Sequence, residues 1–164
     1  MAGQKKILVI SDTHGDYRRT DAVIEREKPF DLLIHCGDLQ MELKALVPDP
    51  SIPVYAVKGN CDIRSDLPEV LTLRVGYYNL MVTHGHKYQV KHTKDILLEA
   101  ARENFADVVL FGHTHVPVNY RSKTGCLVLN PGSLAFPQQF PREATYAVLT
   151  ISDDALPSAE IKVL

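Results

Sequence analysis

The sequence predicts an α/β fold in which two β-sheets lie between outer helices. In the first half of the chain, short runs of Val, Ile and Leu alternate with helical segments, a pattern typical of βαβ units and a parallel sheet. After Pro68, two strand-like runs flank Gly76, Tyr77 and Tyr78, which indicates a hairpin and therefore antiparallel pairing. With further strand-like runs towards the C-terminus, two sheets with helices outside them fit the pattern best.

The elements of the first half begin or end at recognisable residues. A run of β-branched and leucine residues ends at Ser11, and Pro29 stops the first helical segment, which Asp16 is expected to cap. Loops containing glycine and polar residues follow the strand-like runs. Strands are therefore expected over residues 5–10, 31–36 and 53–57, and helices over residues 16–28 and 39–46.

The second half is expected to contain one long helix among several strands. Residues 92–105 carry Leu97 and Ala101, together with Ile96 and Ala100, at the spacing of a buried helical face. The hairpin strands are expected over residues 70–75 and 79–83, and the later strands over residues 107–111, 126–129, 144–151 and 159–164.

Length and composition narrow the function classes. A chain of 164 residues with 45% hydrophobic content can bury a core without disulfides or a structural metal. No internal repeat or linker divides it, so residues 1–164 are expected to form a single domain. The net charge of −2 offers no attraction for nucleic acid or an anionic membrane surface, so neither partner is expected. The oligomeric state stays open, and a homo-oligomer is one alternative.

The apolar runs and the cysteines bear on localisation and redox state. The runs are far shorter than a membrane span, and no signal-peptide-like stretch follows the N-terminus, so a cytoplasmic protein is expected. Cys36, Cys61 and Cys126 form no CxxC motif, which indicates neither a disulfide framework nor a thiolate zinc site. Cys36 and Cys126 are expected to be buried, whereas Cys61 directly follows Asn60 and is expected at the functional site.

Polar side chains able to bind metal ions stand beside glycines at the ends of apolar runs. Five short segments share this pattern, and together they supply oxygen and nitrogen donors suited to two adjacent divalent cations. The crevice outside the carboxyl ends of strands is where open α/β sheets place their sites, so loops distant in sequence converge there. The donors are Asp12, His14, Asp38, Asn60, His84, His113 and His115.

Single residues of this kind carry little weight by themselves. Taken alone, residues 112–115 fit a polar turn as well as a metal site, and only their occurrence with the other segments favours the metal site. His35 and His92 stand outside the pattern and are expected to be satisfied core or surface residues. Arg64 is either a contact for a substrate phosphate or a solvated surface residue.

At the donor positions the sequence resembles the calcineurin-like metallophosphoesterase family, in particular its small prokaryotic phosphodiesterase branch. The resemblance covers nearly the whole chain and rests on five motifs in a fixed order: DxH, GD, GN, H and GHxH. In this chain they stand at Asp12-Thr13-His14, Gly37-Asp38, Gly59-Asn60, His84 and Gly112-His113-Thr114-His115.

The resemblance implies a fold and a metal centre. The fold would be a four-layer αββα sandwich, with two mixed β-sheets flanked by helices. Asp38 would bridge two metal ions. One ion would be held by Asp12, His14, Asp38 and His115, and the other by Asp38, Asn60, His84 and His113.

The implied activity is that of a phosphodiesterase acting on a small phosphoester. Two divalent cations lower the pKa of bound water from about 15.7 to about 7. The hypothesis is that a hydroxide bridging the ions attacks phosphorus, while Asn60 and the cations neutralise charge on the phosphoryl oxygens. Carboxylate and imidazole ligands make Mn²⁺ the first choice, with Fe, Zn²⁺, Ni²⁺ and Mg²⁺ as alternatives.

The sequence departs from the wider family at the group that would protonate the leaving group. Many members have GNHE or GNHD, whereas this chain has Cys61 in place of that histidine, and Met41 stands where relatives place an aspartate that orients it. His86 or a second metal-bound water are the candidates for the acid, and activated or enol-like leaving groups are expected. Cys61 has no activating base in the sequence, so it is not expected to act as a nucleophile.

Two alternatives from other function classes remain. A phosphomonoesterase, nucleotidase or nuclease would keep the metal centre and change the substrate, although the net charge of −2 disfavours polynucleotides. A non-catalytic scaffold resembling a retromer subunit would keep the fold and bind proteins. A scaffold is expected to have lost some donors or to expose a large apolar patch, whereas all of the donor positions are present here.

Overall fold

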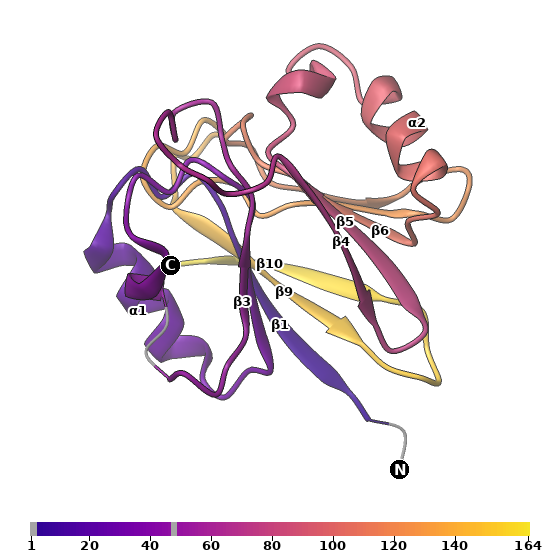
Figure 1. The fold of residues 1–164 in the computed structure, drawn as a ribbon, viewed down its shortest axis with the longest axis horizontal. Coiled ribbons are helices and arrows are strands. Elements are labelled where there is room, and N and C mark those ends of the chain that lie inside the picture. Colours follow the sequence, from indigo (N-terminus) through magenta and orange to yellow (C-terminus); the bar gives the residue numbers. More distant parts are fainter. Residues whose placement is uncertain (1–2, 47–48) are drawn as a thin grey trace.

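The computed structural model describes residues 3–46 and 49–164, which form two five-stranded sheets packed face to face (Figure 1). Sheet A has the order β10 (Ser158–Val163), β9 (Thr145–Ile151), β1 (Lys5–Ile10), β2 (Leu32–His35) and β3 (Val54–Ala56). Sheet B has the order β4 (Val70–Val75), β5 (Tyr78–Thr83), β6 (Val108–Leu110), β8 (Leu127–Asn130) and β7 (Val118–Arg121).

Both sheets mix parallel and antiparallel pairing. In sheet A the strands β1, β2 and β3 run parallel, and β9 and β10 pair antiparallel. In sheet B the strands β5, β6 and β8 run parallel, and β4 and β7 pair antiparallel at its two edges. Helix α1 (Tyr17–Glu27) covers the outer face of sheet A, and helix α2 (Asp95–Glu103) covers that of sheet B. The expected αββα sandwich is confirmed.

The core explains why the central strands read as continuous apolar runs. In β1, Ile7 and Val9 face the layer between the sheets, while Leu8 and Ile10 pack under α1. A strand covered on both faces buries every side chain, so it shows no alternation with polar residues. In α2, Leu97 is fully buried against the outer face of sheet B.

Most expected elements are present with shifted ends. Asp16 caps α1 as expected, because its side chain accepts a hydrogen bond from the Arg19 backbone N–H at 3.0 Å. The helix expected over residues 39–46 is reduced to the 3₁₀ helix η1 (Leu43–Leu46). Strand β7 was not predicted, because it is a largely exposed edge strand with no buried alternation to read.

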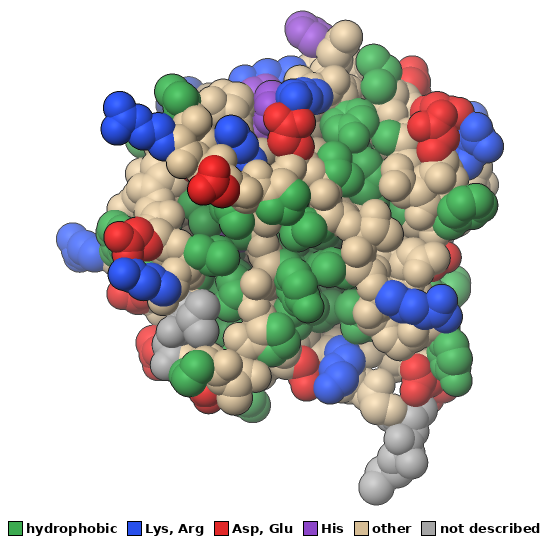
Figure 2. Space-filling model, in the orientation of Figure 1, with side chains coloured by type: hydrophobic (Ala, Val, Ile, Leu, Met, Phe, Trp, Pro, Cys, Tyr) green, Lys and Arg blue, Asp and Glu red, His purple; other side chains and the backbone are tan. Residues whose placement is uncertain are grey.

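The loops after β1, β2, β5 and β6 gather at one end of the sandwich, at the top of Figure 1 and away from the N-terminus. Between the edges of the two sheets, a cavity of about 360 Å³ is lined largely by apolar side chains, including Tyr55 and Leu73. On the face of the molecule seen in Figure 1, charged side chains of both signs surround apolar surface (Figure 2). Within the residues that the structure describes, no helix has both the length and the apolar character needed to cross a membrane.

Candidate metal centre

The loops that carry the expected donors have an unusual backbone. Asp12, His14, Asp38, His113 and His115 all have positive φ angles, between 43° and 69°. Non-glycine residues adopt this left-handed region rarely, and such strain persists only where surrounding structure enforces it. The loops also hold each other, because the Asp12 N–H donates to the Gly37 carbonyl and the His14 N–H to the Asp38 carbonyl, both at 3.0 Å. The donor loops are therefore locked together.

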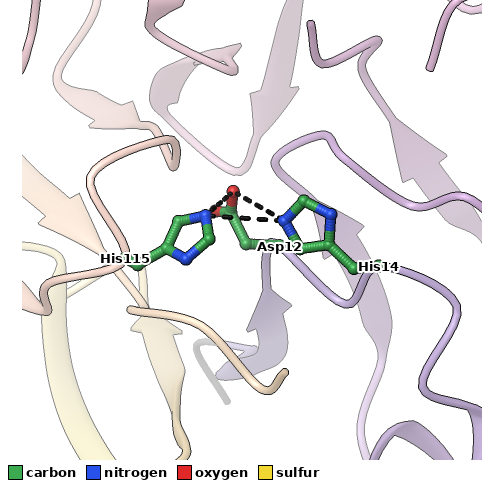
Figure 3. Close-up of side chains that lie close together, drawn as sticks. All are labelled: Asp12, His14 and His115. Atoms are coloured by element: carbon green, nitrogen blue, oxygen red, sulfur yellow. Dashed lines mark hydrogen bonds and ion pairs between the residues drawn. The ribbon is translucent and has the colours of Figure 1, made fainter. Parts of the chain in front are cut away.

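Asp12, His14 and His115 form the first group of side chains (Figure 3). Asp12 follows β1 in sheet A, whereas His115 follows β6 in sheet B, so the group joins the two sheets. The Nε2 atom of His115 lies 3.0 Å from Asp12 Oδ1, and the Nε2 atom of His14 lies 3.9 Å from the same oxygen. The two Nε2 atoms are 3.5 Å apart. Three donor atoms therefore converge on one point.

Asp38, His84 and Asn60 form a second group beside the first. The Nε2 atom of His84 lies 3.3 Å from Asp38 Oδ2 and 3.1 Å from Asn60 Oδ1. Asp38 Oδ2 is also 3.8 Å from His14 Nε2, so Asp38 stands between the two groups. The imidazole ring of His113 packs edge-on against that of His84, with centroids 5.1 Å apart. All seven expected donors are thus brought to one end of the sandwich.

Hydrogen bonds orient the imidazoles towards the shared centre. The Nδ1 atom of His84 lies 2.8 Å from the Cys36 carbonyl, and that of His115 lies 2.7 Å from the Phe136 carbonyl. A carbonyl only accepts, so each Nδ1 carries a proton and each ring turns its Nε2 atom to the carboxylates. This is the arrangement in which metal-binding histidines are held by a second layer of contacts.

The surroundings of the Asp12 carboxylate fit a bound cation. Asp12 Oδ2 accepts hydrogen bonds from the Ser11 hydroxyl at 2.6 Å and from the His113 N–H at 3.0 Å. Asp12 Oδ1 is buried and has no hydrogen-bond partner among the described residues. A buried carboxylate oxygen that faces imidazole nitrogens is stabilised when a positive ion lies between them. The donor set and this oxygen therefore fit a divalent metal ion.

The pKa values show which groups are charged before any ion binds. Burial raises the pKa of Asp12, but its contact with His115 and the charge of His84 lower it below the usual value. Burial also tends to raise the pKa of Asp38, but the hydrogen bond and the charge of His84 outweigh burial. The pKa of Asp38 therefore falls well below its usual range. The pKa of His113 is lowered to about 4 by burial, by His84 and by Lys91. At neutral pH the carboxylates are therefore ionised and His113 is an unprotonated donor.

Two buried side chains position the donor loops, and sequence analysis assigned them no role there. The Asp62 carboxylate accepts backbone hydrogen bonds from Gly59 and Gln40 at 2.9 Å and from Leu39 at 3.2 Å. It thereby joins the loops that follow β2 and β3. Its sequence signals are its place three residues after Gly59, which is typical of many turns, and its match to the acidic last position of the GNHE or GNHD motif.

His35 is the second positioning residue. The Gly37 N–H donates to its Nδ1 at 3.1 Å, so Nε2 carries the proton and donates to the Thr13 hydroxyl at 3.0 Å. The Thr13 hydroxyl in turn donates to the Leu39 carbonyl at 3.1 Å. As expected, His35 is a satisfied core histidine, and burial lowers its pKa to about 4.

Two glycines leave room for the carboxylates. A Cβ atom on Gly59 would lie 2.0 Å from Asp38 Oδ1, and one on Gly112 would lie 2.1 Å from the Ser11 hydroxyl oxygen and 2.6 Å from Asp12 Oδ2. These distances are far shorter than any van der Waals contact. The glycines of the GN and GHxH segments are therefore required by close packing against the donors.

The remaining expected residues lie around the centre. His86 begins the 3₁₀ helix η2 (His86–Tyr88), with its ring centroid 5.4 Å from that of His84 and 6.1 Å from that of His113. Its buried Nδ1 has no hydrogen-bond partner within residues 3–46 and 49–164. Burial and the charge of His84 lower the pKa of His86. His92 and Arg64 are exposed.

The cysteines follow the expectations. Cys36 and Cys126 are buried, and Cys61 is half-buried at the centre, where its N–H donates to Asp38 Oδ1 at 2.8 Å. The Cys61 sulfur also lies within 4.8 Å of donor atoms of His14 and Asp38. Burial, with the nearby Asp38 charge, raises the pKa of the Cys61 thiol to about 11. A thiol protonated at neutral pH is a poor nucleophile, which agrees with the sequence analysis.

Known proteins are similar to this chain in sequence over most of its length. Residues 6–154 match the family model of the calcineurin-like phosphoesterase superfamily domain. Over 151 residues the chain is 39% identical to the protein of Bacillus subtilis named probable metallophosphoesterase YsnB, covering 91% of this chain and 86% of that protein. Over 159 residues it is 28% identical to phosphodiesterase YfcE of Escherichia coli, covering 81% of each.

Solved structures share its fold. A Streptococcus pneumoniae protein described as a predicted phosphoesterase matches with a TM-score of 0.83 and 32% identity, covering 98% of this chain and 90% of that chain. Vacuolar Protein Sorting 29 of Cryptosporidium parvum matches with a TM-score of 0.75 and 16% identity, covering 98% of both chains; at that identity it shows the fold alone. The family match and the identity to a bacterial metallophosphoesterase show that this chain belongs to the calcineurin-like phosphoesterase superfamily.

Proposed function

We propose that this chain is a phosphodiesterase that uses two divalent metal ions to hydrolyse a small phosphodiester. The observation that carries the proposal is the buried Asp12 Oδ1, which has no hydrogen-bond partner among the described residues and lies 3.0 Å from the Nε2 atom of His115, beside a second carboxylate, Asp38. One ion would be held by Asp12, His14, Asp38 and His115, and the other by Asp38, Asn60, His84 and His113. Phosphodiesterase YfcE, a relative by sequence, supports the choice of a diester.

The ions supply Lewis acidity, which lowers the pKa of water and neutralises charge on phosphate. The chain's own residues hold and orient the reactants. Asn60 is exposed at the centre. Its side-chain N–H group contacts the Cys61 sulfur at 3.4 Å and no other acceptor among the described residues, so it is available to donate to a phosphoryl oxygen. Because the donors mix carboxylates with imidazoles, Mn²⁺ is the first metal to test, followed by Fe, Zn²⁺, Ni²⁺ and Mg²⁺.

His86 is our candidate for the residue that protonates the leaving group. It stands beside His84 and His113, and its buried Nδ1 lacks a partner among the described residues. A neutral ring at this place is able to relay a proton from water to the leaving oxygen. A second metal-bound water is the alternative acid.

The test compares bis(p-nitrophenyl) phosphate with p-nitrophenyl phosphate, with and without Mn²⁺. The expected result is metal-dependent hydrolysis with a higher kcat/KM for the diester, and a loss of roughly 10³-fold or more in Asp38→Ala, because Asp38 stands between both donor groups. Asp154→Asn is the control, since Asp154 is exposed in the turn before β10. With hydrolysis followed by phosphorus NMR, His86→Gln is expected to slow a methyl p-nitrophenyl diester less than a dialkyl diester, whose leaving group needs the proton.

Other outcomes would select the alternatives. Faster hydrolysis of the monoester would make the chain a phosphomonoesterase or nucleotidase. Equal rates in the wild type and in Asp38→Ala would contradict catalysis at this centre and favour a protein-binding scaffold with the fold of Vacuolar Protein Sorting 29.

A further inference from the structure

A hollow of about 540 Å³ opens beside the candidate metal centre on the side of sheet B. His113 and His115 form part of its wall, so a group held there would lie next to the reacting phosphate of the proposed function. The segment between η2 and α2 also lines it and contributes Lys91 and Lys94. The lining of the hollow therefore combines two of the metal-ligand candidates with two lysines.

The charge of this hollow is one-sided. None of the described residues that line it is acidic. Within residues 3–46 and 49–164, neither Lys91 nor Lys94 has a carboxylate within ion-pair distance. Lys87, only four residues before Lys91, is by contrast paired with Glu69 at 2.6 Å. Two positive charges thus face the hollow without a protein counter-charge.

Lys94 is held in place rather than free in solvent. Its ammonium group donates to the Val90 carbonyl and lies 5.8 Å from the centre of the Phe111 ring. One hydrogen-bond contact leaves further N–H groups of the ammonium available to another acceptor. The neutral polar groups of Thr114 and Gln138 complete the lining. A ligand would find donors here that are already positioned.

The hollow on the side of sheet A has a different character. It measures about 610 Å³ and is lined by Leu39, Met41, Ile63 and Leu67 among others, with Arg64 as its basic residue. The Asp62 carboxylate is part of the same lining. A phosphodiester carries one substituent on each side of its phosphorus, and the two hollows offer them unlike surroundings. The sheet B hollow suits the more negative arm.

We propose that Lys91 and Lys94 bind a phosphomonoester group on one arm of the substrate, so that preferred diesters carry a second phosphate. This inference rests on the proposed phosphodiesterase function. A phosphomonoester carries a charge between about −1.5 and −2 at neutral pH, which two ammonium groups match. Lysine is a common partner of phosphate as a compact point charge.

The experiment uses the Mn²⁺-loaded protein and two substrates that differ by one group: thymidine 5′-(p-nitrophenyl phosphate) with and without a 3′-phosphate. Release of p-nitrophenol reports cleavage of the diester alone. The expected kcat/KM is about tenfold higher for the substrate with the 3′-phosphate, mainly through KM, which is the effect of one charge-assisted contact. The double variant Lys91→Gln with Lys94→Gln is expected to lower this ratio of kcat/KM values to about one, and Lys91→Arg is expected to retain most of the tenfold difference.

The control is Lys123→Gln, which removes an exposed lysine from the turn between β7 and β8, and it is expected to keep the wild-type ratio. Lys91→Gln alone, which leaves the Lys94 contacts intact, is expected to lower the ratio in a protein with an unchanged melting temperature. A wild-type ratio near one, or a ratio that survives the double substitution, would overturn the inference and leave the proposed function standing.

A binding measurement separates the two proposals. Calorimetry is expected to show tighter binding of thymidine 3′,5′-bisphosphate than of thymidine 5′-monophosphate, with the difference lost in the double lysine variant. If the wild type hydrolyses neither diester, the proposed function fails, and this difference alone decides whether the hollow binds phosphate. Equal affinities in the wild type would then refute the hollow as well.

Discussion

Glu27 and Asp12 are both buried carboxylates of sheet A or its covering helix, and they are partnered in opposite ways. Glu27 ends α1 and is 3% exposed, yet it accepts from the Tyr146 hydroxyl and the Lys162 ammonium at 2.8 Å and pairs with Lys6 at 3.0 Å. One Asp12 oxygen accepts hydrogen bonds from a hydroxyl and a backbone N–H, whereas the other has no hydrogen-bond partner among the described residues.

The comparison separates a structural charge from a functional one. Burying a carboxylate without compensation is costly, so proteins pair such groups or leave them to a metal ion. Two lysines of the same chain, Lys6 and Lys162, compensate the charge of Glu27. Among the described residues, the ionisable side chains within 4 Å of Asp12 are imidazoles instead. Burial lowers the pKa values of His84 and His115, but the carboxylates outweigh it and raise both above the usual value. We therefore expect a cation from outside the chain to balance the charge of Asp12.

The largest effect is expected from substituting each carboxylate by its amide. Asp12→Asn should reduce metal-dependent diester hydrolysis by roughly 10³-fold or more, because an amide holds a cation much less strongly than a carboxylate does. Wild-type protein should gain about 4 kcal/mol of stability at a Mn²⁺ concentration of about 1,000 times Kd, and Asp12→Asn should lose most of this gain. Kinetic assays and thermal unfolding with and without Mn²⁺ measure both. Glu27→Gln is the control that should retain hydrolysis and the gain; equal behaviour of the two variants would break the comparison.

A smaller effect is expected from the pH dependence of folding stability. Burial raises the pKa of Glu27, but the hydrogen bonds from Lys162 and Lys6 outweigh this and lower it from 4.5 to about 2. A lowered folded-state pKa stabilises the fold above the unfolded value, so this contribution is complete above about pH 5 and is lost as pH falls from 4.5 towards 2. Its size is on the order of 3 kcal/mol. Urea unfolding of metal-free protein at pH 7 and pH 3 should show a smaller loss in Glu27→Gln than in the wild type; identical losses would refute this role.

The smallest effect is expected from removing one hydroxyl donor from each carboxylate. Tyr146→Phe should lower the free energy of unfolding by about 1 kcal/mol, because Glu27 keeps both lysines. Ser11→Ala should weaken Mn²⁺ affinity by about tenfold, since the Ser11 hydroxyl orients the Asp12 carboxylate. Calorimetric titration of Mn²⁺ and urea unfolding of both variants test this pair. A change in Mn²⁺ affinity in Tyr146→Phe would show that the two carboxylates are not independent.

The strands and the donor loops were largely predictable from local patterns. The apolar runs that became β1, β2 and β6 are short, those of β2 and β6 are soon followed by a glycine, and donors stand within three residues of the end of each strand. Two elements were not predicted correctly from the sequence. Strand β7 is exposed at an edge, so its residues show no apolar pattern, and η1 replaced a longer predicted helix because only four residues have helical hydrogen bonding.

The sequence by itself determined which residue types stand at the ends of the strands, because strand pattern and glycine punctuation are written within a few neighbouring residues. Only the tertiary structure decided that Asp12 from sheet A meets His115 from sheet B, that Asp62 joins two donor loops, and that Asp12 Oδ1 has no hydrogen-bond donor within the part of the chain that the structure describes. These are contacts between residues far apart in the chain. They depend on how two sheets pack, which no local pattern records.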